Sequence, residues 1–152
     1  MSSFCSCELC VSALTFLVLC CVAVPELPLG YFHKMFSEAV LDHFRNPRNA
    51  GELPGATATV EVSNPVCGDV LKLSARIVDG QIAEARFLCC GCTTSIACAS
   101  LLTEQICGRT FAQTRNLTPE SLSKSLGGLP PATFHGAQLA IDGLKALVEK
   151  SL

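Results

Sequence analysis

The apolar residues first recur at helical spacing, just after residue 35. In "FSEAVLDHFRNP" (36–47), Phe36, Val40, Leu41 and Phe44 fall on one side of a helix. Ser37 is a suitable N-cap for this helix, and Pro47 cannot continue it. The pattern predicts a short amphipathic helix, followed by the polar, glycine-containing loop "RNAGELPG".

After this loop, the spacing of the apolar residues changes from the helical period of 3.6 residues to the strand period of 2. The segments "ATVEVSNP" (58–65), "DVLKLSARIVDG" (69–80) and "QIAEARFL" (81–88) are rich in β-branched and other apolar residues. Asp79 and Gly80 form a strong two-residue hairpin signal between the second and third segments. These three segments predict an antiparallel meander.

Helical spacing returns after residue 92. "TTSIACASLLTEQICG" (93–108) ends on a glycine suited to a helix C-terminus, and Thr118 with Pro119 predicts the cap and first residue of a short helix. In 134–152, a final amphipathic helix would turn Leu139, Leu144, Leu147 and Val148 inward. We therefore predict an α+β fold for residues 35–152, with a small antiparallel three-stranded sheet, helices packed on one face, and a C-terminal amphipathic helix.

Residues 1–34 differ from the rest, being apolar and cysteine-rich, and we expect them to lie outside this fold. The apolar run at 9–24 is shorter than the roughly 20 residues that span a bilayer. It is typical of a signal peptide, yet no Lys or Arg precedes it. A spurious start upstream of a true start at Met35 is our preferred interpretation, and a signal or anchor or a folded extension are the alternatives.

Composition narrows the class of function. The chain of 152 residues has a net charge of −2, one Tyr and no Trp. The sequence has no cluster of Lys and Arg to contact phosphates and few aromatic residues on which bases could stack, so we do not expect nucleic acid as a partner. Eleven cysteines are an odd number for a closed disulfide framework. In a cytosolic protein such clusters favour metal or redox chemistry.

Three segments carry candidate metal ligands. Cys67 and Asp69 lie in the turn "NPVCGD" (64–69), Cys92 stands where a strand gives way to a helix, and His135 begins the last helix. Unpaired amides and the dipole at a helix N-terminus favour an anion at Cys92. Each residue alone has an ordinary structural explanation. Together, two thiolates, a carboxylate and an imidazole suit Zn²⁺ or an iron–sulfur cluster.

The remaining cysteines of the domain have weaker claims. Strand alternation puts Cys89 on the sheet face of Phe87 and Cys90 on the opposite face, so one of the two belongs to the core. Cys98 and Cys107 fall within an apolar helical pattern, where cysteine acts as a small hydrophobic residue.

Several motifs, in this order and spacing, resemble the NifU/IscU family of iron–sulfur cluster assembly scaffolds. They are "MFSEAVLDHFRNPRNAG", "NPVCGD", "GCTTSIACASLLTE", "LGGLPP" and "FH". The resemblance runs from Met35 to about Lys150, and "LGGLPP" is most similar to the NifU branch. It implies that Cys67, Asp69, Cys92 and His135 bind iron and the cluster.

The resemblance also implies a function. A scaffold of this kind is a carrier rather than an enzyme: it takes iron and the sulfur from a cysteine desulfurase, assembles a labile 2Fe-2S cluster, and passes it to apo iron–sulfur client proteins. A carboxylate is a poor match for iron beside thiolates, so it would leave the cluster exchangeable. We expect a cytoplasmic protein with no membrane contact unless residues 9–24 are an anchor.

The sequence departs from the family at two places. Gly136 occupies the position of a third cysteine, which in the family is a ligand and a sulfur acceptor. The segment "LPPAT" (129–133) lacks the Val-Lys ending of the family members that depend on a chaperone. One hypothesis is that the site is completed by Cys67, Asp69, Cys92 and His135, with Cys89 or Cys90 as a candidate substitute for the missing thiol. The other is that the protein is a degenerate member that binds zinc or only carries iron or sulfur. A thiol enzyme, with Cys92 as nucleophile and His135 as base, is a further alternative.

Overall fold

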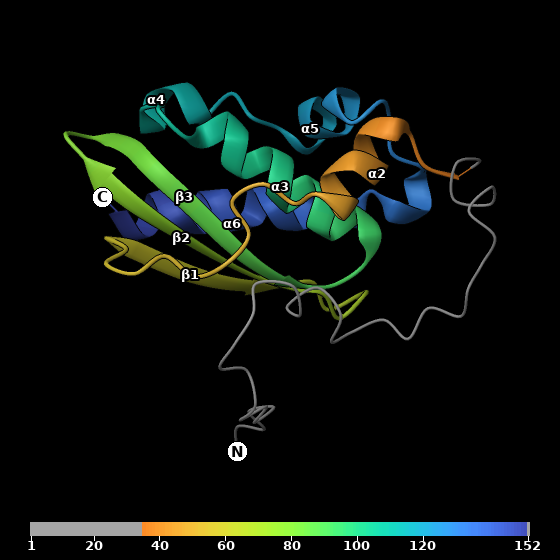
Figure 1. The fold of residues 1–152 in the computed structure, drawn as a ribbon, viewed down its shortest axis with the longest axis horizontal. Helices are drawn as coiled ribbons and strands as arrows, with labels where there is room; N and C mark the ends of the chain where they lie inside the picture. The colour runs from red at the N-terminus through yellow and green to blue at the C-terminus, as the bar shows by residue number, and fades with distance from the viewer. Residues whose placement is uncertain (1–34, 152) are drawn as a thin grey trace, which may run out of the picture.

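A computed structural model describes residues 35–151 of the chain, and the prediction about residues 1–34 lies outside this range. Figure 1 shows a sheet with helices gathered on one of its faces. In chain order the elements are α2 (Glu38–Arg45), β1 (Ala58–Ser63), β2 (Val70–Val78), β3 (Gln81–Cys90), α3 (Thr93–Ile106), α4 (Phe111–Thr114), α5 (Pro119–Ser125), the 3₁₀ turn η1 (Pro131–Thr133) and α6 (His135–Ser151).

The sheet is the predicted antiparallel meander. Its strand order is β1-β2-β3, with Val62 opposite Leu71 and Leu71 opposite Cys89. Asp79 and Gly80 both have positive φ, at 50° and 75°, as a two-residue hairpin with the right-handed twist of the strands requires. The hairpin prediction is confirmed.

Two long helices cover one face of the sheet. α6 packs on β1 and β2, α3 packs on β3, and the two helices also contact each other. α2 lies against α3, and α5 lies against α6 (Figure 1). The α+β architecture with helices on one face, and its C-terminal amphipathic helix, are therefore confirmed.

The core lies between these layers. The inward positions of β2 and β3 meet the apolar faces of α3 and α6, and the largest fully buried side chains include Leu71, Leu73, Ile82, Leu102, Ile106, Ile141 and Leu147. Burying an aliphatic side chain of this size contributes about 1.5–3 kcal/mol relative to leaving it exposed. This core holds the start of α3 against the sheet.

Local signals fixed most of the helix ends. Ser37 caps α2 by accepting a hydrogen bond from the Val40 amide, and its hydroxyl also donates to the Leu126 carbonyl. Thr118 caps α5 with Pro119 in the first turn, as predicted. The short helix α4, with its capping box at Thr110, and η1 were not predicted. Both are too short to produce a periodic apolar pattern.

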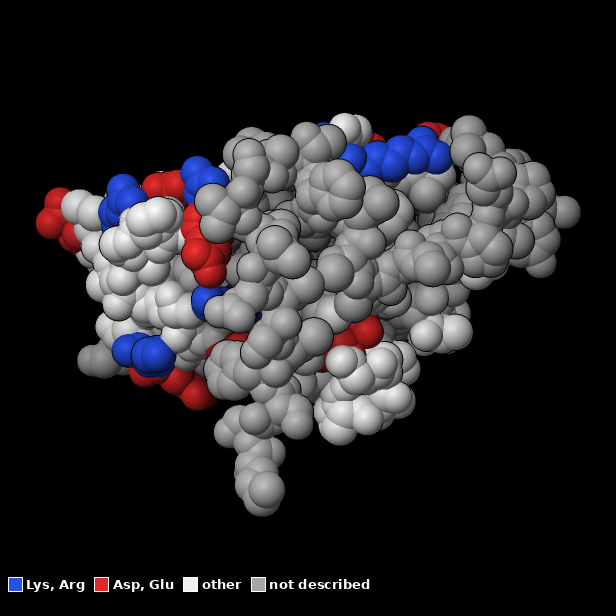
Figure 2. Space-filling view, turned by 60° about the horizontal axis from the view of Figure 1, so that its bottom comes forward, with Lys and Arg blue, Asp and Glu red and all other residues white. Residues whose placement is uncertain are grey.

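Charged side chains alternate in sign on the described part of the surface drawn in Figure 2. Glu84 pairs with Arg76 and Arg86, and Glu52 pairs with Lys72. Exposed pairs of this kind contribute little to stability, typically 0–1 kcal/mol. The described charges on this face therefore do not form a patch of a single sign.

His43 is a buried imidazole between α2 and α3. Its Nδ1 lies 2.9 Å from the Ser100 hydroxyl, and its Nε2 lies 3.8 Å from a Glu104 carboxylate oxygen. Burial lowers the pKa of His43, and the charge of Arg48 lowers it further. Glu104 and Asp42 act in the opposite direction without reversing the shift. The neutral form of His43 is therefore the one that suits the folded state.

The lowered pKa predicts a pH-dependent stability. Below the ordinary value of 6.5 the unfolded chain binds a proton at His43 that the folded chain resists, so the free energy of unfolding falls as the pH falls. We expect the melting temperature to drop less between pH 7.5 and 5.5 in His43→Asn than in the wild type. An equal drop in His43→Asn and wild type would contradict the prediction.

Candidate functional site

The first site segment is the turn between β1 and β2. The amide of Val66 donates to Asn64 Oδ1 at 2.8 Å, and the amide of Gly68 donates to the Asn64 carbonyl at 2.8 Å. Gly68 has φ +75°, a conformation that glycine adopts without steric cost. This arrangement leaves Cys67 exposed at the tip of the turn.

Asp69 ends the turn and points to the start of α3. Its Oδ2 accepts a hydrogen bond from the Ser95 hydroxyl at 2.5 Å and another from the Cys92 amide at 3.3 Å. Only 6% of Asp69 is exposed. A Cβ added to Gly91 would lie 2.8 Å from Asp69 Cγ, so the close approach requires a glycine there. The carboxylate therefore caps α3 from another element.

Cys92 is the N-cap residue of α3, as its position after the strand predicted. Its thiol is exposed and makes no side-chain cap bond to the helix amides. Its Sγ lies 3.0 Å from Thr94 Oγ1 and 3.3 Å from Ser95 Oγ. Two hydroxyl groups thus hold the sulfur at the helix end, where the dipole favours an anionic ligand.

His135 is the exposed first residue of α6, again as predicted. The next residue, Gly136, is buried against the first turn of α3: a Cβ added there would lie 2.8 Å from the Ser95 nitrogen and 2.9 Å from the Thr94 carbonyl carbon. The start of α6 therefore touches the start of α3. This contact brings His135 to the same end of the molecule as Cys92.

Two of the four predicted ligands are in direct contact, and the other two lie on neighbouring segments. Asp69 and Cys92 are linked by a hydrogen bond, whereas Cys67 and His135 stand on the neighbouring turn and helix. Within residues 35–151, no three His, Cys, Asp or Glu side chains lie close enough together to hold a metal ion as they stand. The four-residue ligand set stays a prediction that requires side chains to turn toward one another.

Cys89 and Cys90 are separated by the sheet. Cys89 pairs with buried Leu71 and packs against the core on the helix-covered face, whereas exposed Cys90 pairs with Val70. Burial raises the pKa of the Cys89 thiol to about 12, and the charges of Asp69, Cys92, Cys90 and Cys67 contribute to the increase. Burial is the main cause of the raised pKa, so the Cys89 thiol stays protonated in the folded domain.

The remaining two cysteines fit their predicted structural role. Cys98 is fully buried in α3, and burial raises its pKa to about 12. Cys107 is half-buried at the C-terminal end of the same helix, and burial raises its pKa as well. Both thiols stay protonated and act as small apolar side chains.

Thr94 and Ser95 are site residues that the sequence reasoning missed. Both are almost fully buried, and both contact Cys92 Sγ. A hydroxyl two or three residues after an N-cap cysteine reaches back to the helix end, so "CTTS" contained a usable signal. The link from Ser95 to Asp69 spans 26 residues and had no local signal.

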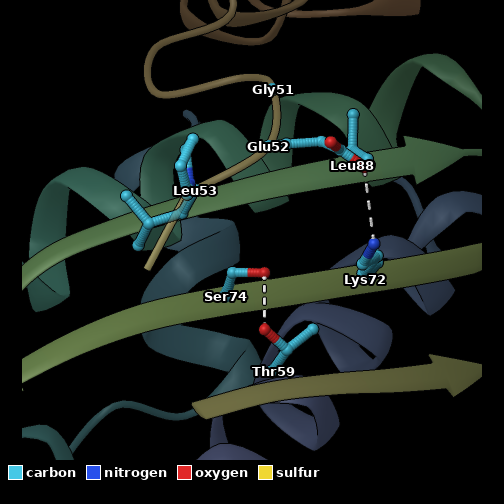
Figure 3. A pocket seen from close by; sticks show the side chains of 8 residues that line it. Gly51, Glu52, Leu53, Thr59, Lys72, Ser74 and Leu88 are labelled. Carbon is cyan, nitrogen blue, oxygen red and sulfur yellow. Dashed lines mark hydrogen bonds and ion pairs between the residues drawn. The ribbon is translucent and has the colours of Figure 1, made fainter. Parts of the chain in front are cut away.

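A separate hollow of about 280 Å³ lies on the outer face of the sheet. It is lined by Gly51, Glu52, Leu53, Pro54, Thr59, Lys72, Ser74 and Leu88, and Figure 3 shows its Thr59–Ser74 hydrogen bond and Glu52–Lys72 ion pair. Its polar groups are paired with one another, and its lining includes no cysteine or histidine. The hollow is therefore not the candidate metal site.

Comparison with known proteins settles the family. The sequence model of the NifU-like N-terminal domain matches residues 35–151. The chain belongs to this family. The matched range coincides with the described fold and includes all four candidate ligands of the NifU-like domain.

Individual relatives agree with this assignment. The NifU-like chain is 37% identical over 114 residues to iron–sulfur cluster assembly scaffold protein IscU 1 of Archaeoglobus fulgidus, covering 75% of this chain and 74% of that protein. It is 37% identical to the iron–sulfur cluster assembly enzyme IscU of Drosophila melanogaster, covering 81% and 79%. The crystal structure of a NifU-like N-terminal protein from Brucella abortus shares the fold, with a TM-score of 0.61 and 17% identity, covering 74% of this chain and 90% of that one.

Within the described residues of the NifU-like domain, no helix is long and apolar enough to cross a bilayer.

The contact at Gly136 predicts a steric cost for any side chain at that position. We expect Gly136→Ala to lower the free energy of unfolding by about 1–3 kcal/mol, because the new Cβ overlaps the α3 backbone, which cannot give way as a side chain can. Urea unfolding of the purified NifU-like protein would measure the change.

Gly143→Ala in the same helix is the matched control. Its Cβ would meet the end of the flexible Leu71 side chain at 3.1 Å, so the loss should be smaller. Alanine is favoured over glycine inside a helix by about 1 kcal/mol. A Gly136→Ala variant as stable as the wild type would therefore show that α6 and α3 are not in such close contact.

Proposed function

We propose that this NifU-like chain is an iron–sulfur cluster assembly scaffold. It takes up iron and desulfurase-derived sulfur, assembles a labile 2Fe-2S cluster, and transfers it to apo-proteins. The observation that carries the proposal is the junction at the N-terminus of α3, where Asp69 is hydrogen-bonded to Cys92 and where α6 brings His135 to the same end. A relative named as a scaffold, 37% identical over most of its length, supports it.

The chemistry of the donors fits a cargo that must be released. Cys67 and Cys92 offer exposed sulfurs that would bind iron firmly as thiolates, whereas Asp69 offers a hard oxygen that binds iron less well beside them. His135 offers an exposed imidazole. A mixed set of ligands gives up its cluster more readily than four thiolates, so the proposed role is that of a carrier rather than an enzyme.

The same donor set suits a resting zinc ion. Zinc accepts cysteine, histidine and aspartate ligands in a tetrahedral arrangement. We propose that Zn²⁺ can occupy the ligands between rounds of assembly and that iron and sulfide displace it. Zinc binding is thus part of the scaffold proposal rather than a sign of a degenerate protein.

Cys89 is the better substitute for the family's third thiol. It lies on the helix-covered face, and Asp69 is the strongest charged influence on its pKa, whereas Cys90 points to the opposite face. Because the raised pKa keeps Cys89 protonated, iron would have to displace its proton on binding. Cys89 would therefore join the ligand set only when metal is present.

A reducing compartment suits this role. Cys67, Cys89, Cys92, Cys98 and Cys107 are free thiols in the structure, and thiols persist in the cytoplasm. A cysteine desulfurase and apo iron–sulfur proteins are the expected partners. Cytoplasmic location stays a prediction, to be checked by fractionation of cells that produce the protein from its own gene.

Reconstitution tests the scaffold proposal directly. After anaerobic incubation with ferrous iron, cysteine, a cysteine desulfurase and a thiol reductant that converts the persulfide sulfur to sulfide, we expect a coloured protein whose visible absorbance disappears when an apo-ferredoxin is added. Cys67→Ser and Cys92→Ser should each reduce the bound iron and sulfide severalfold, because each removes a thiolate ligand. Cys107→Ser, at the far end of α3, is the matched control. A colourless wild type, or equal loss in the control, would refute the proposal.

The choice between Cys89 and Cys90 has its own test. We expect Cys89→Ser to lower cluster occupancy and Cys90→Ser to leave it unchanged, because only the first side chain lies on the face that carries the proposed ligands. Iron and sulfide assays of the reconstituted variants would measure this. The reverse ranking, or no effect of either change, would remove Cys89 from the ligand set.

A further inference from the structure

Ser95 stands at the point where two proposed ligands meet. Its hydroxyl lies 2.5 Å from Asp69 Oδ2 and 3.3 Å from Cys92 Sγ, and only 2% of the residue is exposed. Neither the scaffold proposal nor the family resemblance gave this residue a role. A buried hydroxyl that contacts both an acidic and a thiol ligand is placed to control where each one points.

The Ser95 hydroxyl has one proton, so it can donate a hydrogen bond to only one of its two neighbours. An ionised carboxylate can only accept hydrogen bonds, so the proton of Ser95 is donated to Asp69. The Cys92 amide donates to the same oxygen, Oδ2. Both bonds therefore hold one oxygen of the carboxylate at the start of α3, and Oδ1 is the atom that can bind a metal while the carboxylate stays anchored.

The backbone around Ser95 is fixed. Its nitrogen and Cα would lie 2.8 and 3.0 Å from a Cβ at Gly136, so α6 packs directly on this residue. Ser95 also belongs to the first turn of α3, which packs on the sheet through β3. A hydroxyl held from both sides in this way gives Asp69 a defined direction rather than a range of rotamers.

We propose that Ser95 is a positioning residue of the site: it anchors Asp69 through Oδ2, directs Oδ1 toward the metal, and thereby sets the affinity of the site. This proposal rests on the proposed function, because it presupposes that Asp69 binds metal. Ser95 itself would not touch the metal. Its influence would reach the metal through Asp69, because the one hydroxyl proton is donated to that carboxylate and none is left for a Cys92 thiolate.

Zinc affinity of the full chain tests this role. We expect Ser95→Ala to bind Zn²⁺ about 10–100-fold more weakly than the wild type, measured by competition with a chromophoric chelator. Ser95→Thr, which keeps the hydroxyl, should recover most of the affinity. Thermal melting of each metal-free variant would show the fraction that is folded at the assay temperature.

Ser100→Ala is the matched control for burial and hydrogen bonding. Ser100 is also buried in α3, and its hydroxyl contacts His43 Nδ1 and accepts from the Arg48 amide, so its loss costs two hydrogen bonds away from the site. We expect Ser100→Ala to lower the melting temperature without changing zinc affinity. Equal affinity losses in Ser95→Ala and Ser100→Ala would overturn the positioning role.

A double-mutant cycle separates this inference from the scaffold proposal. In an Asp69→Ala background, Ser95→Ala should cause a smaller loss of zinc affinity than in the wild type, because the anchored group is gone. Equal losses in both backgrounds would refute action through Asp69. A wild type that binds neither Zn²⁺ nor iron would instead refute the metal site, and the proposed function with it.

Discussion

The hydrogen bonds between Asp69 and the first turn of α3 are the interaction on which the site end of the molecule depends. The first amides of a helix have no partner within it, and the N-cap Cys92 offers them no side-chain acceptor. Asp69, 23 residues earlier in the chain, accepts from one of these amides, that of Cys92 itself, and from the hydroxyl of Ser95 in the first turn. The sheet and the helical layer are thus joined by an anion placed at the positive end of a helix dipole.

Two glycines make this junction possible. Gly91 leaves room for the Asp69 carboxylate, and Gly136 leaves room for the α3 backbone, since a Cβ at either position would come within 2.8 Å of an atom of its neighbour. The turn before β2, the end of β3 and the start of α6 therefore converge on a single helical turn. In the proposed site, backbone packing brings the segments that carry the ligands together, and the side chains then have to turn toward one another to hold a metal.

Local signals in the sequence account for the main helices and strands of the fold, but not for α4 and η1. Ser37 and Thr118 as caps, the Asp79–Gly80 hairpin and the position of Cys92 at a helix start each follow from side chains within a few residues. What could not be predicted is long-range. The cap that Asp69 gives to α3, the bond from Ser95 and the tight contact at Gly136 join residues that the sequence separates by 23 to 42 positions.

The glycine at 136 has a different meaning once this packing is known. From the sequence it is a missing thiol, and restoring a cysteine there would be the obvious repair. In the structure the space for its Cβ is occupied by the backbone of Thr94 and Ser95, so a cysteine could be accommodated only by moving the turn that holds Asp69 and Cys92. In the proposed site, a third thiol would come from a position that leaves this turn in place. Cys89, on the inner face of β3 and already under the electrostatic influence of Asp69 and Cys92, meets that condition.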